Sequence, residues 1–420
     1  MITGTIEALA FGGSGILRDD RHVIFVPFTA PGDKITARIL KQKKRHAEGK
    51  LVTLIEASQE RVTPQCPHFG ICGGCQLQHL NTSAQLAAKR RFIQDALRHL
   101  PAIDVPPITP PSHLWAYRQH IRLHLHRKEP NAPLQLGYMN LAEHVPISHC
   151  PIFTANDDPL FQHLSAFLQT PAWDSVSTGH LRILKQQKGY LIVIQLEHFP
   201  ADLIAACPKA LSPTIVGIIL ASPSPVHFGH TECHWNQIQF SPFGFIQNHP
   251  EESLHLYQFI LDQIPSNTQS VLDLYCGVGI TTLMLGKRGI QTVGVESHAE
   301  TIKWAKKNAT SVATVSFHVG TAEKLGTQLL KSNSYDWVLV NPPRIGLAPS
   351  VVSALVQSAP QGIVYVSCMP PTLARDLKPL LEGGYRIQKI QGFDLFPQTT
   401  HVETVVILTK TAHQSCKSSD

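Results

Sequence analysis

The chain has 420 residues, more than one ordinary hydrophobic core holds, so two or three domains are expected. Hydrophobic residues make up 43% and charged residues 16% of it, a balance that excludes a disordered protein. No apolar run is long enough to cross a bilayer, and the first residues lack a secretory signal, so we expect a cytoplasmic protein with no membrane partner. The net charge of +6 fits a polyanionic partner but does not by itself indicate one.

The first 57 residues alternate short apolar runs with turns that contain glycine, proline or aspartate. About five strand-like segments are punctuated by turns such as GGSG and PGD, and this pattern predicts a small β-barrel of the oligonucleotide-binding type. A basic run, KQKKRH at 41–46, precedes the last of these strands. Most such runs are solvated turns, but on a small barrel a basic loop can also contact phosphate groups.

Three of the nine cysteines, Cys66, Cys72 and Cys75, fall within a stretch of ten residues. A disulfide is not expected in a reducing cytoplasm. Thiols at this density are typical of a metal site, for which a fourth ligand is needed. On spacing alone, zinc ranks first.

A helix is predicted over 83–100, with Ser83 at its N-cap and no internal glycine or proline. This helix could pack on the C-terminal domain. The proline-rich stretch at 101–115 ends it and is interpreted as a linker. Several β-type runs within 116–240 favour a mixed, strand-rich α+β central domain.

From about residue 241, helical stretches alternate with apolar, β-branched runs. Buried strands that alternate with helices predict a doubly wound, mostly parallel α/β sheet of the Rossmann type. The expected domains are therefore 1–57, 58–240 and 241–412, followed by a polar tail at 413–420.

One strand of this region runs into a glycine-containing turn, VLDLYCGVG, and then into a helix. Gly277 and Gly279 let the backbone approach a ligand at the carboxyl edge of the sheet, and Glu296 ends the next strand, where a carboxylate suits a ribose diol. A dinucleotide dehydrogenase is the alternative, but the string lacks the third glycine that seats a pyrophosphate on the helix. Asp273 at the strand end instead favours a ligand with an amino group and no phosphate, such as S-adenosylmethionine.

Three further residues stand at strand ends in the same region. Asn341 is followed by two prolines, a loop common in methyltransferases that act on amino nitrogens or nucleobases. Cys368 lies at the carboxyl tip of a buried strand, and Glu403 begins the last strand. Isolated cysteines are mostly core residues, but a thiol and a carboxylate base beside a methyl donor match one particular chemistry.

That chemistry is the methylation of carbon 5 of uracil, which is a poor nucleophile. A thiolate that adds to carbon 6 turns the ring into an enolate, and carbon 5 then attacks the methyl group of a sulfonium. A base must afterwards remove the proton from carbon 5 so that the thiolate can leave. This route needs a cysteine with a depressed pKa and a target base flipped out of its stack.

Five motifs follow one another along the chain: CGGCQLQH, LDLYCGVG, NPPR, SCMPPTLARDL and HVET. In this order and at this approximate spacing they resemble the RNA uracil-5-methyltransferase family, over nearly the full length of the chain. The resemblance implies that residues 1–57 form a TRAM domain, a small RNA-binding barrel. It makes Cys368 the nucleophile and Glu403 the proton acceptor. The donor contacts that it implies are Gln247, Tyr275, Glu296 and Asn341.

In the same family branch, cysteines like the three described above bind a 4Fe-4S cluster, with the fourth ligand in a His-Cys-Pro element downstream. Here that element is ISHCPIF, so the resemblance implies Cys150. An iron–sulfur cluster is favoured by the resemblance and not by the spacing, and zinc is the alternative. The central domain, residues 58–240, is thus expected to carry this cluster and an RNA-binding surface.

Several residues depart from the family pattern, among them Asn341, where many members have Asp, and Met369 and His249, where Asn is usual. These departures leave the reaction class standing but bear on the RNA target. We expect 23S ribosomal RNA as the substrate, with the T-loop of transfer RNA as the alternative. A non-catalytic RNA-binding or folding factor is a third hypothesis, against which the intact Cys368 and Glu403 pair argues. The sequence indicates no obligate protein partner.

Overall fold

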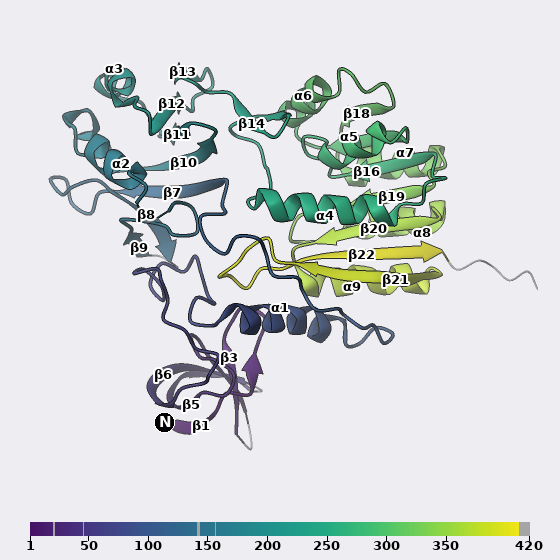
Figure 1. Ribbon diagram of the computed structural model, residues 1–420, viewed down its shortest axis with the longest axis horizontal. Coiled ribbons are helices and arrows are strands. Elements are labelled where there is room, and N and C mark those ends of the chain that lie inside the picture. The colour runs from purple at the N-terminus through teal and green to yellow at the C-terminus, as the bar shows by residue number, and fades with distance from the viewer. Residues whose placement is uncertain (20–21, 45, 141–142, 156, 411–420) are drawn as a thin grey trace, which may run out of the picture.

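The computed structural model describes residues 1–19, 22–44, 46–140, 143–155 and 157–410. A β-barrel lies at one end, the central domain and the catalytic sheet lie at the other, and one long helix lies between them (Figure 1). The tail expected at 413–420 falls outside the described residues. Within those residues, no helix is both long and apolar enough to span a membrane.

The N-terminal barrel has six strands in its described part, where about five were expected. They are β1 (Ile2–Thr5), β2 (Ala8–Leu9), β3 (Gly15–Arg18), β4 (Val23–Val26), β5 (Lys34–Gln42) and β6 (His46–Glu56), in the sheet order β1-β5-β6-β4-β3-β2. Alternate side chains of these strands are buried, and Ile24, Val26 and Ile35 lie in the core. Lys41, at the end of β5, and Lys43 are exposed.

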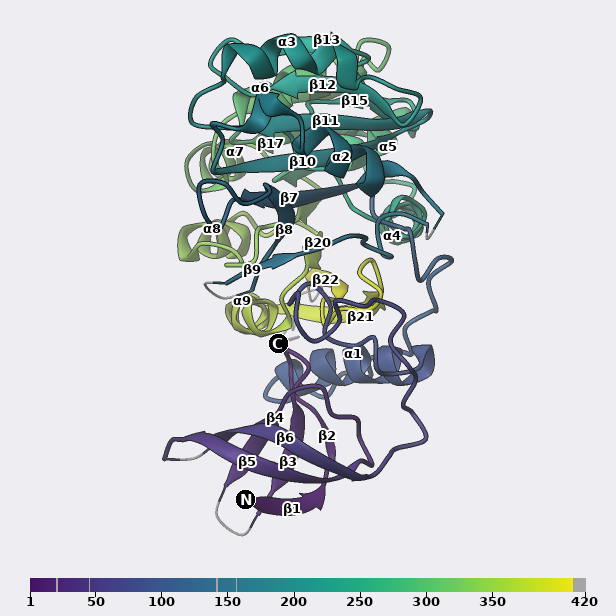
Figure 2. The same cartoon turned by 90° about the vertical axis from the view of Figure 1, so that its left-hand side faces the viewer.

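Helix α1 (Thr82–Leu97) lies between the barrel and the catalytic domain (Figures 1 and 2). Asn81 rather than Ser83 is its N-cap, because the Asn81 Oδ1 atom accepts a hydrogen bond of 2.9 Å from the backbone N–H of Ala84. Phe92 packs with barrel residues on one side, and Ile93 packs into the catalytic core on the other. Both faces of the helix are therefore covered.

The proline-rich stretch after α1 is packed and does not behave as a free linker. Val105 and Ile108 are buried in the core of the catalytic domain. A side chain at Gly392 would meet Ile108 at 3.0 Å, so the two segments are in close contact. The prolines prevent regular secondary structure here, but they do not prevent burial of the apolar residues between them.

In its described residues, the central domain contains a seven-stranded sheet in the order β13-β12-β11-β10-β7-β8-β9. One face, with Leu123, Ile183 and Ile192, packs on the helices of this domain. Leu184 and Val193 on the opposite face contact the catalytic domain. The elements are β7 (His120–His126), β8 (Gln135–Asn140), β9 (Glu143–Pro146), α2 (Leu160–Leu168), η1 (Pro171–Trp173), β10 (Thr178–Gln186), β11 (Gly189–Gln195), α3 (Ala201–Ala210), β12 (Ile215–Leu220) and β13 (Val226–Gly229).

A short hairpin, β14 (Cys233–Trp235) and β15 (Ile238–Phe240), joins the central and catalytic domains. The backbone N–H of Gln239 donates to the Asn308 side chain over 2.9 Å, and the Asn308 amide donates back to the Gln239 carbonyl over 2.8 Å. The packing of the catalytic domain thus begins before residue 241.

The catalytic domain is a seven-stranded sheet in the order β18-β17-β16-β19-β20-β22-β21. The pairs among β18, β17, β16, β19 and β20 are parallel, whereas β22 runs antiparallel to both of its neighbours. The elements are α4 (Pro250–Gln263), β16 (Ser270–Leu274), α5 (Ile280–Lys287), β17 (Gln291–Glu296), α6 (Ala299–Asn308), β18 (Val315–Val319), η2 (Ala322–Gly326), α7 (Thr327–Ser332), β19 (Trp337–Val340), α8 (Pro349–Ser358), β20 (Gly362–Ser367), α9 (Pro370–Glu382), β21 (Tyr385–Phe393) and β22 (Glu403–Lys410).

Candidate active site

The predicted nucleophile and base meet at the carboxyl edge of the catalytic sheet. The parallel strands β16, β17, β19 and β20 all end at this edge, and the antiparallel β22 begins there. Ser367 pairs with Thr404 at the end of the β20–β22 ladder. The next residues outward on the two strands are Cys368 and Glu403, so the register places them opposite each other.

Burial sets the electrostatics of this pair. Glu403 is only 4% exposed, and its burial raises the pKa of the carboxyl to about 7. Burial, and after it the neighbouring Glu403, raise the pKa of the Cys368 thiol to about 11, while the Arg344 guanidinium opposes the rise. The depressed cysteine pKa expected from the chemistry is therefore wrong for the free protein, because desolvation and a like charge outweigh the arginine.

Arg344 and His401 form a second pair beside the first. The Arg344 Nη2 atom donates to the Nε2 atom of His401 over 3.0 Å. Burial, followed by the nearby Arg344, lowers the pKa of His401 to about 4, so the imidazole is neutral and can accept this hydrogen bond. Both residues lie in motifs that the sequence singles out, NPPR and HVET, but the motifs alone give them no role.

The loop between β21 and β22, which leads into Glu403, is held by side chains of α1. Lys89 Nζ donates to Asp394 Oδ1 over 2.5 Å, and these side chains are 0% and 2% exposed. Two hydrogen bonds of 3.0 Å join Gln85 and Gln398. The Gln85 Nε2 atom donates to Gln398 Oε1, and the backbone N–H of Gln398 donates to Gln85 Oε1. Gln398 has a φ of 70°, an unfavourable value that this double contact stabilises.

The segment that follows the cysteine cluster also supports this loop. The backbone N–H groups of Gln76 and Leu77 both donate to the carbonyl of Gln398, over 3.1 and 3.0 Å. The Tyr117 hydroxyl donates to the carbonyl of Pro397 over 3.0 Å. Sequence reasoning missed all of these residues, because their partners lie hundreds of positions away in the chain.

The glycine turn after β16 has the shape that a close-lying ligand needs. Gly279 has a φ of 80°, and a Cβ atom there would lie 2.4 Å from Phe317 Cζ, so only glycine fits. Gly277 has a φ of 55°, and a Cβ atom there would meet nothing within 4 Å. Tyr275 in the same turn also has a positive φ, of 63°. The strained turn thus leaves open space directly over Gly277.

Asp273 is fully buried and fastens this turn to α5. Its Oδ2 atom accepts hydrogen bonds from the hydroxyls of Thr281 and Thr282, at 2.6 and 2.7 Å. Burial raises the pKa of its carboxyl to about 6. Its Oδ1 atom has no hydrogen-bond partner among the described residues. The carboxylate therefore supports the turn from within the protein.

The other expected donor contacts lie at the end of β17, before α4 and directly after β19. Glu296, at the end of β17, accepts hydrogen bonds from the Ser297 hydroxyl and the His298 backbone through one oxygen, Oε1. Gln247 is 6% exposed, and its Oε1 atom lacks a partner within the described part of the chain. Asn341 follows β19, next to β16 in the sheet. An unpartnered buried amide oxygen and an open glycine turn fit a polar ligand with donor groups.

His249, which departs from the family pattern, has a clear structural role. It is the N-cap of α4, where its Nδ1 atom accepts from the backbone N–H of Glu252 over 3.5 Å. Its Nε2 atom contacts the carbonyl of His113 over 3.0 Å, and its ring stacks on that of Tyr117 at 5.0 Å. This histidine therefore acts in packing.

The four predicted ligand cysteines line one cavity of about 100 Å³ in the central domain. They are Cys66, Cys72, Cys75 and Cys150, and burial raises the pKa of each thiol, to about 11 for Cys75 and about 12 for Cys150. Arg118 also lines the cavity, and its buried Nε atom has no partner among the residues described. A buried cation without a carboxylate indicates that an anionic group belongs beside it.

The geometry of this cavity bears on what could fill it. In the described part of the chain, no three His, Cys, Asp or Glu side chains converge on one position that could hold a metal ion. Four thiols around one cavity are the donor set of a four-thiolate zinc ion and also of a four-thiolate iron–sulfur cluster. Either centre is anionic beside Arg118, so the residues present fit both.

Comparisons with known proteins agree with this geometry. Residues 2–59 match the family described as tRNA (uracil(54)-C(5))-methyltransferase, TRAM domain, and residues 227–411 match the family described as tRNA (Uracil-5-)-methyltransferase. An RNA methyltransferase of Protochlamydia amoebophila is 42% identical over 97% of this chain and 98% of that protein. The 23S rRNA (uracil(1939)-C(5))-methyltransferase of Yersinia enterocolitica is 34% identical over 97% of this chain and 94% of its own. The chain belongs to the RNA uracil-5-methyltransferase family.

A solved structure of this family matches the whole fold. It is the tRNA (uracil-54, C5)-methyltransferase of Pyrococcus abyssi in complex with S-adenosyl-L-homocysteine, which is 26% identical, covers 97% of this chain and 100% of its own, and has a TM-score of 0.76. The expected TRAM barrel and Rossmann-like methyltransferase domain are confirmed. The chain is thus a uracil-5-methyltransferase that uses S-adenosylmethionine and acts on RNA.

Proposed function

We propose that this enzyme methylates a uridine of 23S ribosomal RNA through a covalent bond between the Cys368 sulfur and carbon 6 of the uracil ring. The observation that carries the mechanism is the register of β20 and β22, which puts Cys368, directly after β20, next to Glu403, the first residue of β22. A nucleophile and a base on adjacent strands can both reach one flipped ring. Glycine, tyrosine and acidic residues of the donor turn stand at the same edge.

In the proposed reaction, the Cys368 thiolate bonds to carbon 6 and the electron pair of the C5=C6 double bond moves toward the carbon 4 oxygen. S-adenosylmethionine, when bound at the donor turn, would supply the methyl group to carbon 5, and its S–CH3 bond would break to release S-adenosylhomocysteine. Glu403 then removes the proton from carbon 5, so that the double bond re-forms and the thiolate leaves. With a pKa of about 7, Glu403 is close to the value that serves a base best at neutral pH.

Ionisation of Cys368 requires help, because burial and Glu403 raise the pKa of its thiol to about 11 in the free enzyme. Arg344 is the cation that favours the thiolate. In the free protein Arg344 donates to His401. The same guanidinium also hydrogen-bonds the Cys368 side chain, and both its charge and this hydrogen bond favour the thiolate.

The donor is assigned to the turn over Gly277, with contacts from Gln247, Tyr275, Glu296 and Asn341. The open space at Gly277 and the unpartnered Gln247 amide oxygen support this placement. Asp273 is assigned the shaping of the turn, since one of its oxygens is held by two threonines.

We assign a 4Fe-4S cluster to Cys66, Cys72, Cys75 and Cys150, with Arg118 as the buried counter-charge. The shared cavity and its four thiols support a four-thiolate centre, and the family resemblance favours a cluster over zinc. Anaerobically purified protein should contain about four iron atoms and absorb visible light, as the bound cluster requires. Stoichiometric zinc in a colourless protein would contradict the assignment.

The mechanism is tested with RNA that carries 5-fluorouridine, because fluorine at carbon 5 leaves no proton for Glu403 to remove. Wild-type enzyme should form a stable covalent complex that depends on S-adenosylmethionine, and Cys368→Ala should form none. Cys207→Ala, which removes a buried thiol of α3, is the matched control and should behave as wild type. Full methylation by Cys368→Ala would refute the mechanism.

The choice of RNA rests on the relatives. The 34% identity to the Yersinia enterocolitica enzyme named for 23S rRNA supports that substrate. The Pyrococcus abyssi structure, named for transfer RNA, makes the T-loop the second candidate. Side-by-side methylation of 23S rRNA and transfer RNA transcripts decides between them. Transfer of labelled methyl to neither RNA, nor to total RNA, would indicate a non-catalytic RNA-binding factor.

A further inference from the structure

The loop that carries Arg344 has little packing of its own. It joins β19 to α8 with the sequence NPPRIGLA, whose prolines and glycine exclude a regular helix or strand. Pro343, Arg344 and Ile345 are exposed one after another, Ile345 to 75%. A cavity of about 790 Å³ lies against this loop and against α8 and α9. Few apolar contacts therefore hold residues 343–345, and their position depends on hydrogen bonds.

Two neighbouring side chains of α9 supply most of these hydrogen bonds. The Arg375 Nη2 atom donates to the carbonyls of Ile345 and Leu347, over 2.7 and 3.3 Å. The backbone N–H of Leu347 donates to Asp376 Oδ2 over 2.7 Å. A cation and an anion of one helix thus bind the acceptor and donor groups of the loop backbone.

A third side chain of α9 reaches the residue that matters most. The Thr372 hydroxyl lies 3.1 Å from the carbonyl of Arg344 and 3.0 Å from the carbonyl of Met369, so its one proton is shared between them. Thr372, Arg375 and Asp376 together form what we call the α9 clamp. They lie on one side of the helix, since residues three and four apart face the same way.

The clamp is fastened to the strand of the nucleophile. Asp376 is 3% exposed, its Oδ2 atom also accepts from the Tyr365 hydroxyl over 2.7 Å, and its Oδ1 atom accepts from Arg375 Nε over 2.8 Å. Tyr365 lies on β20, the strand that Cys368 directly follows. Gly346 has a φ of 76°, and a Cβ atom there would lie 2.4 Å from Asp376 Oδ2, so only glycine lets the loop come this close.

The loop bears on the chemistry through the Arg344 side chain. Its guanidinium hydrogen-bonds the Cys368 side chain and donates to His401 Nε2 over 3.0 Å. Of the described cations, Arg344 is the one whose charge most favours the Cys368 thiolate. The position of its backbone therefore decides how close this charge lies to the sulfur.

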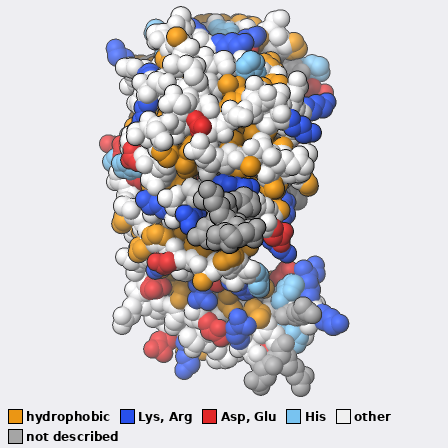
Figure 3. All heavy atoms as spheres, turned by 90° about the vertical axis from the view of Figure 1, so that its right-hand side faces the viewer, with side chains coloured by type: hydrophobic (Ala, Val, Ile, Leu, Met, Phe, Trp, Pro, Cys, Tyr) orange, Lys and Arg blue, Asp and Glu red, His pale blue; other side chains and the backbone are white. Residues whose placement is uncertain are grey.

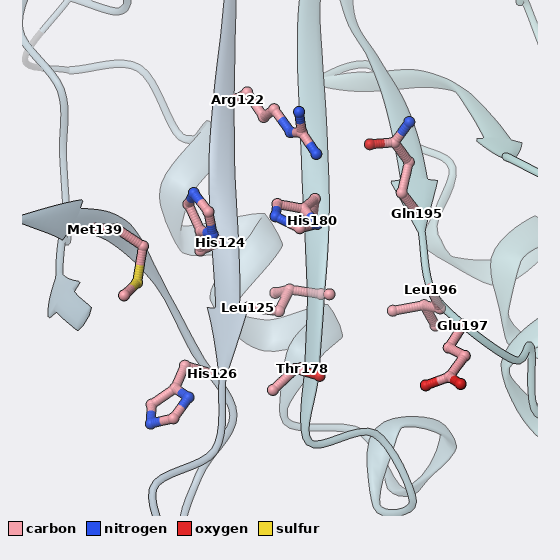
Figure 4. A pocket seen from close by; sticks show the side chains of 11 residues that line it. Arg122, His124, Leu125, His126, Met139, Thr178, His180, Gln195, Leu196 and Glu197 are labelled. Carbon is pink, nitrogen blue, oxygen red and sulfur yellow. The ribbon is translucent and has the colours of Figure 1, made fainter. Parts of the chain in front are cut away.

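Other cations of the molecule lie outside this arrangement. A cavity of about 520 Å³ on the central sheet contains Arg122, but every described residue of its lining belongs to the central domain (Figure 4). On the side of the molecule where β22 ends, Lys and Arg side chains stand at separate points, with Asp and Glu among them (Figures 1 and 3). Neither group belongs to the loop or to α9, so the cation that the clamp places beside Cys368 is Arg344.

We propose that the α9 clamp consists of positioning residues for methyl transfer: by fixing the backbone at 343–347, it keeps the Arg344 guanidinium beside the Cys368 sulfur. The clamp acts through Arg344 and touches neither the uracil ring nor the donor. Without it the guanidinium is free to move away, and the attraction between two charges falls as their distance grows. The proposal rests on the proposed function, since it takes Cys368 as the nucleophile.

The test measures the charge beside Cys368 in enzyme without RNA. Iodoacetamide and iodoacetate both alkylate a thiolate by displacement of iodide, but the first is neutral and the second is an anion. The rate constants are followed at one fixed pH by mass spectrometry of the peptide that contains Cys368. Because thiol ionisation and access affect both reagents alike, the ratio of the iodoacetate to the iodoacetamide rate constant reports a nearby cation.

Arg344→Gln sets the lower limit of this ratio, about fourfold or more below wild type for a charge about 5 Å from the sulfur. Arg375→Met should lower the ratio by about twofold to fourfold, whereas Arg375→Lys, which keeps one donor, should change it by less than about 1.5-fold. The Arg375 side chain is 55% exposed, so these changes leave the core intact. Thr372→Val should lower the ratio by about 1.5- to 2-fold, and it removes no charge, so its effect must come from the position of Arg344.

Methylation gives a second measurement of the same effect. Arg375→Met should lower kcat by about 10-fold, which corresponds to the loss of one or two hydrogen bonds. Its affinity for S-adenosylhomocysteine in calorimetry should stay at the wild-type value. In the Arg344→Gln background, Arg375→Met should lower neither the ratio nor kcat any further, because the clamp acts through Arg344.

The matched control is Arg288→Met, at the opposite edge of the sheet. Arg288 follows α5 just before β17 begins, and its Nη1 atom donates to the carbonyl of Leu261 over 2.7 Å, so the same kind of hydrogen bond is removed. This variant should keep the wild-type ratio and kcat. An equal loss in the control would overturn the proposal, because the effect would not be local.

A wild-type ratio in both Arg375→Met and Thr372→Val would also overturn the proposal, even with a lowered kcat, because the clamp would then be merely structural. Further loss in the Arg344→Gln background would do the same, since the clamp would not act through Arg344. Absence of methyl transfer by the wild type, together with a lowered ratio in the variants, would refute the proposed function and still support the placement of Arg344 by the clamp.

Discussion

Replacing Glu403 by glutamine should make the protein more stable and abolish turnover at the same time. The carboxyl is 4% exposed, and its burial raises its pKa from the ordinary 4.5 to about 7. At about 1.4 kcal/mol for each pKa unit, this difference corresponds to about 3 kcal/mol. Glutamine has nearly the same shape and never carries the charge.

The sign follows from the direction of the pKa change. Below the unfolded pKa the carboxyl is protonated in both states, and its contribution to stability is fully present. As the pH rises through about 7, the folded protein must bury a carboxylate that the unfolded chain exposes to water, so this contribution is lost. The unfolding free energy of Glu403→Gln relative to wild type should therefore increase by about 2 to 3 kcal/mol when the pH is raised from about 5 to about 8.5.

The unfolding free energy is measured by urea titration at both pH values, and hydrogen exchange separately reports the local stability of β20 and β22. The control is Glu382→Gln, at the exposed end of α9. In parallel, Glu403→Gln should accumulate the covalent complex with unmodified RNA, since the proton on carbon 5 cannot leave. A stability difference that does not change with pH would show that the buried carboxylate is not the cause. Normal turnover by this variant would remove Glu403 from the mechanism.

Three further variants probe the support of the site. Lys89→Met leaves Asp394 buried without its cation and should lower the unfolding free energy by about 3 to 5 kcal/mol in urea, whereas Lys89→Met/Asp394→Leu should recover most of the loss. Gly279→Ala forces a clash at positive φ and should lower the unfolding free energy by about 1 to 3 kcal/mol in thermal unfolding. Gly277→Ala has no such clash and should lower the unfolding free energy by about 1 kcal/mol. Its main effect should be weaker binding of S-adenosylhomocysteine, measured by calorimetry. Gln247→Ala should weaken the same binding by about fivefold with unchanged melting temperature, and unaltered affinity would remove it from the donor contacts.

Local patterns in the sequence were sufficient for the residues at strand ends. A run of apolar, β-branched residues followed by a functional side chain indicates a buried strand and its carboxyl tip, and this places Cys368, Glu296 and Asn341 at one edge. The antiparallel direction of β22 has no such local sign. It is the reason why Glu403, at the beginning of its strand, reaches the edge where the other strands end.

The supports of the site could not be predicted in the same way. Gln85 and Lys89 are four residues apart on α1 and look like an ordinary solvated face, yet both are buried against the loop after β21. The proline-rich stretch after α1 has linker composition and nevertheless packs in a core. The pKa of Cys368 depends on burial and on a neighbour from another strand, neither of which is visible in its motif.

The hydrogen bonds between α1 and the loop before β22 join residues 305 and 313 positions apart. During synthesis, the proposed nucleophile therefore leaves the ribosome before the proposed base. A nascent chain that has emerged through α9 contains the barrel, the cysteine cavity and Cys368, but not Glu403. Under the proposed mechanism, the base is in place only when the loop before β22 packs on α1 and β22 pairs with β20 and β21.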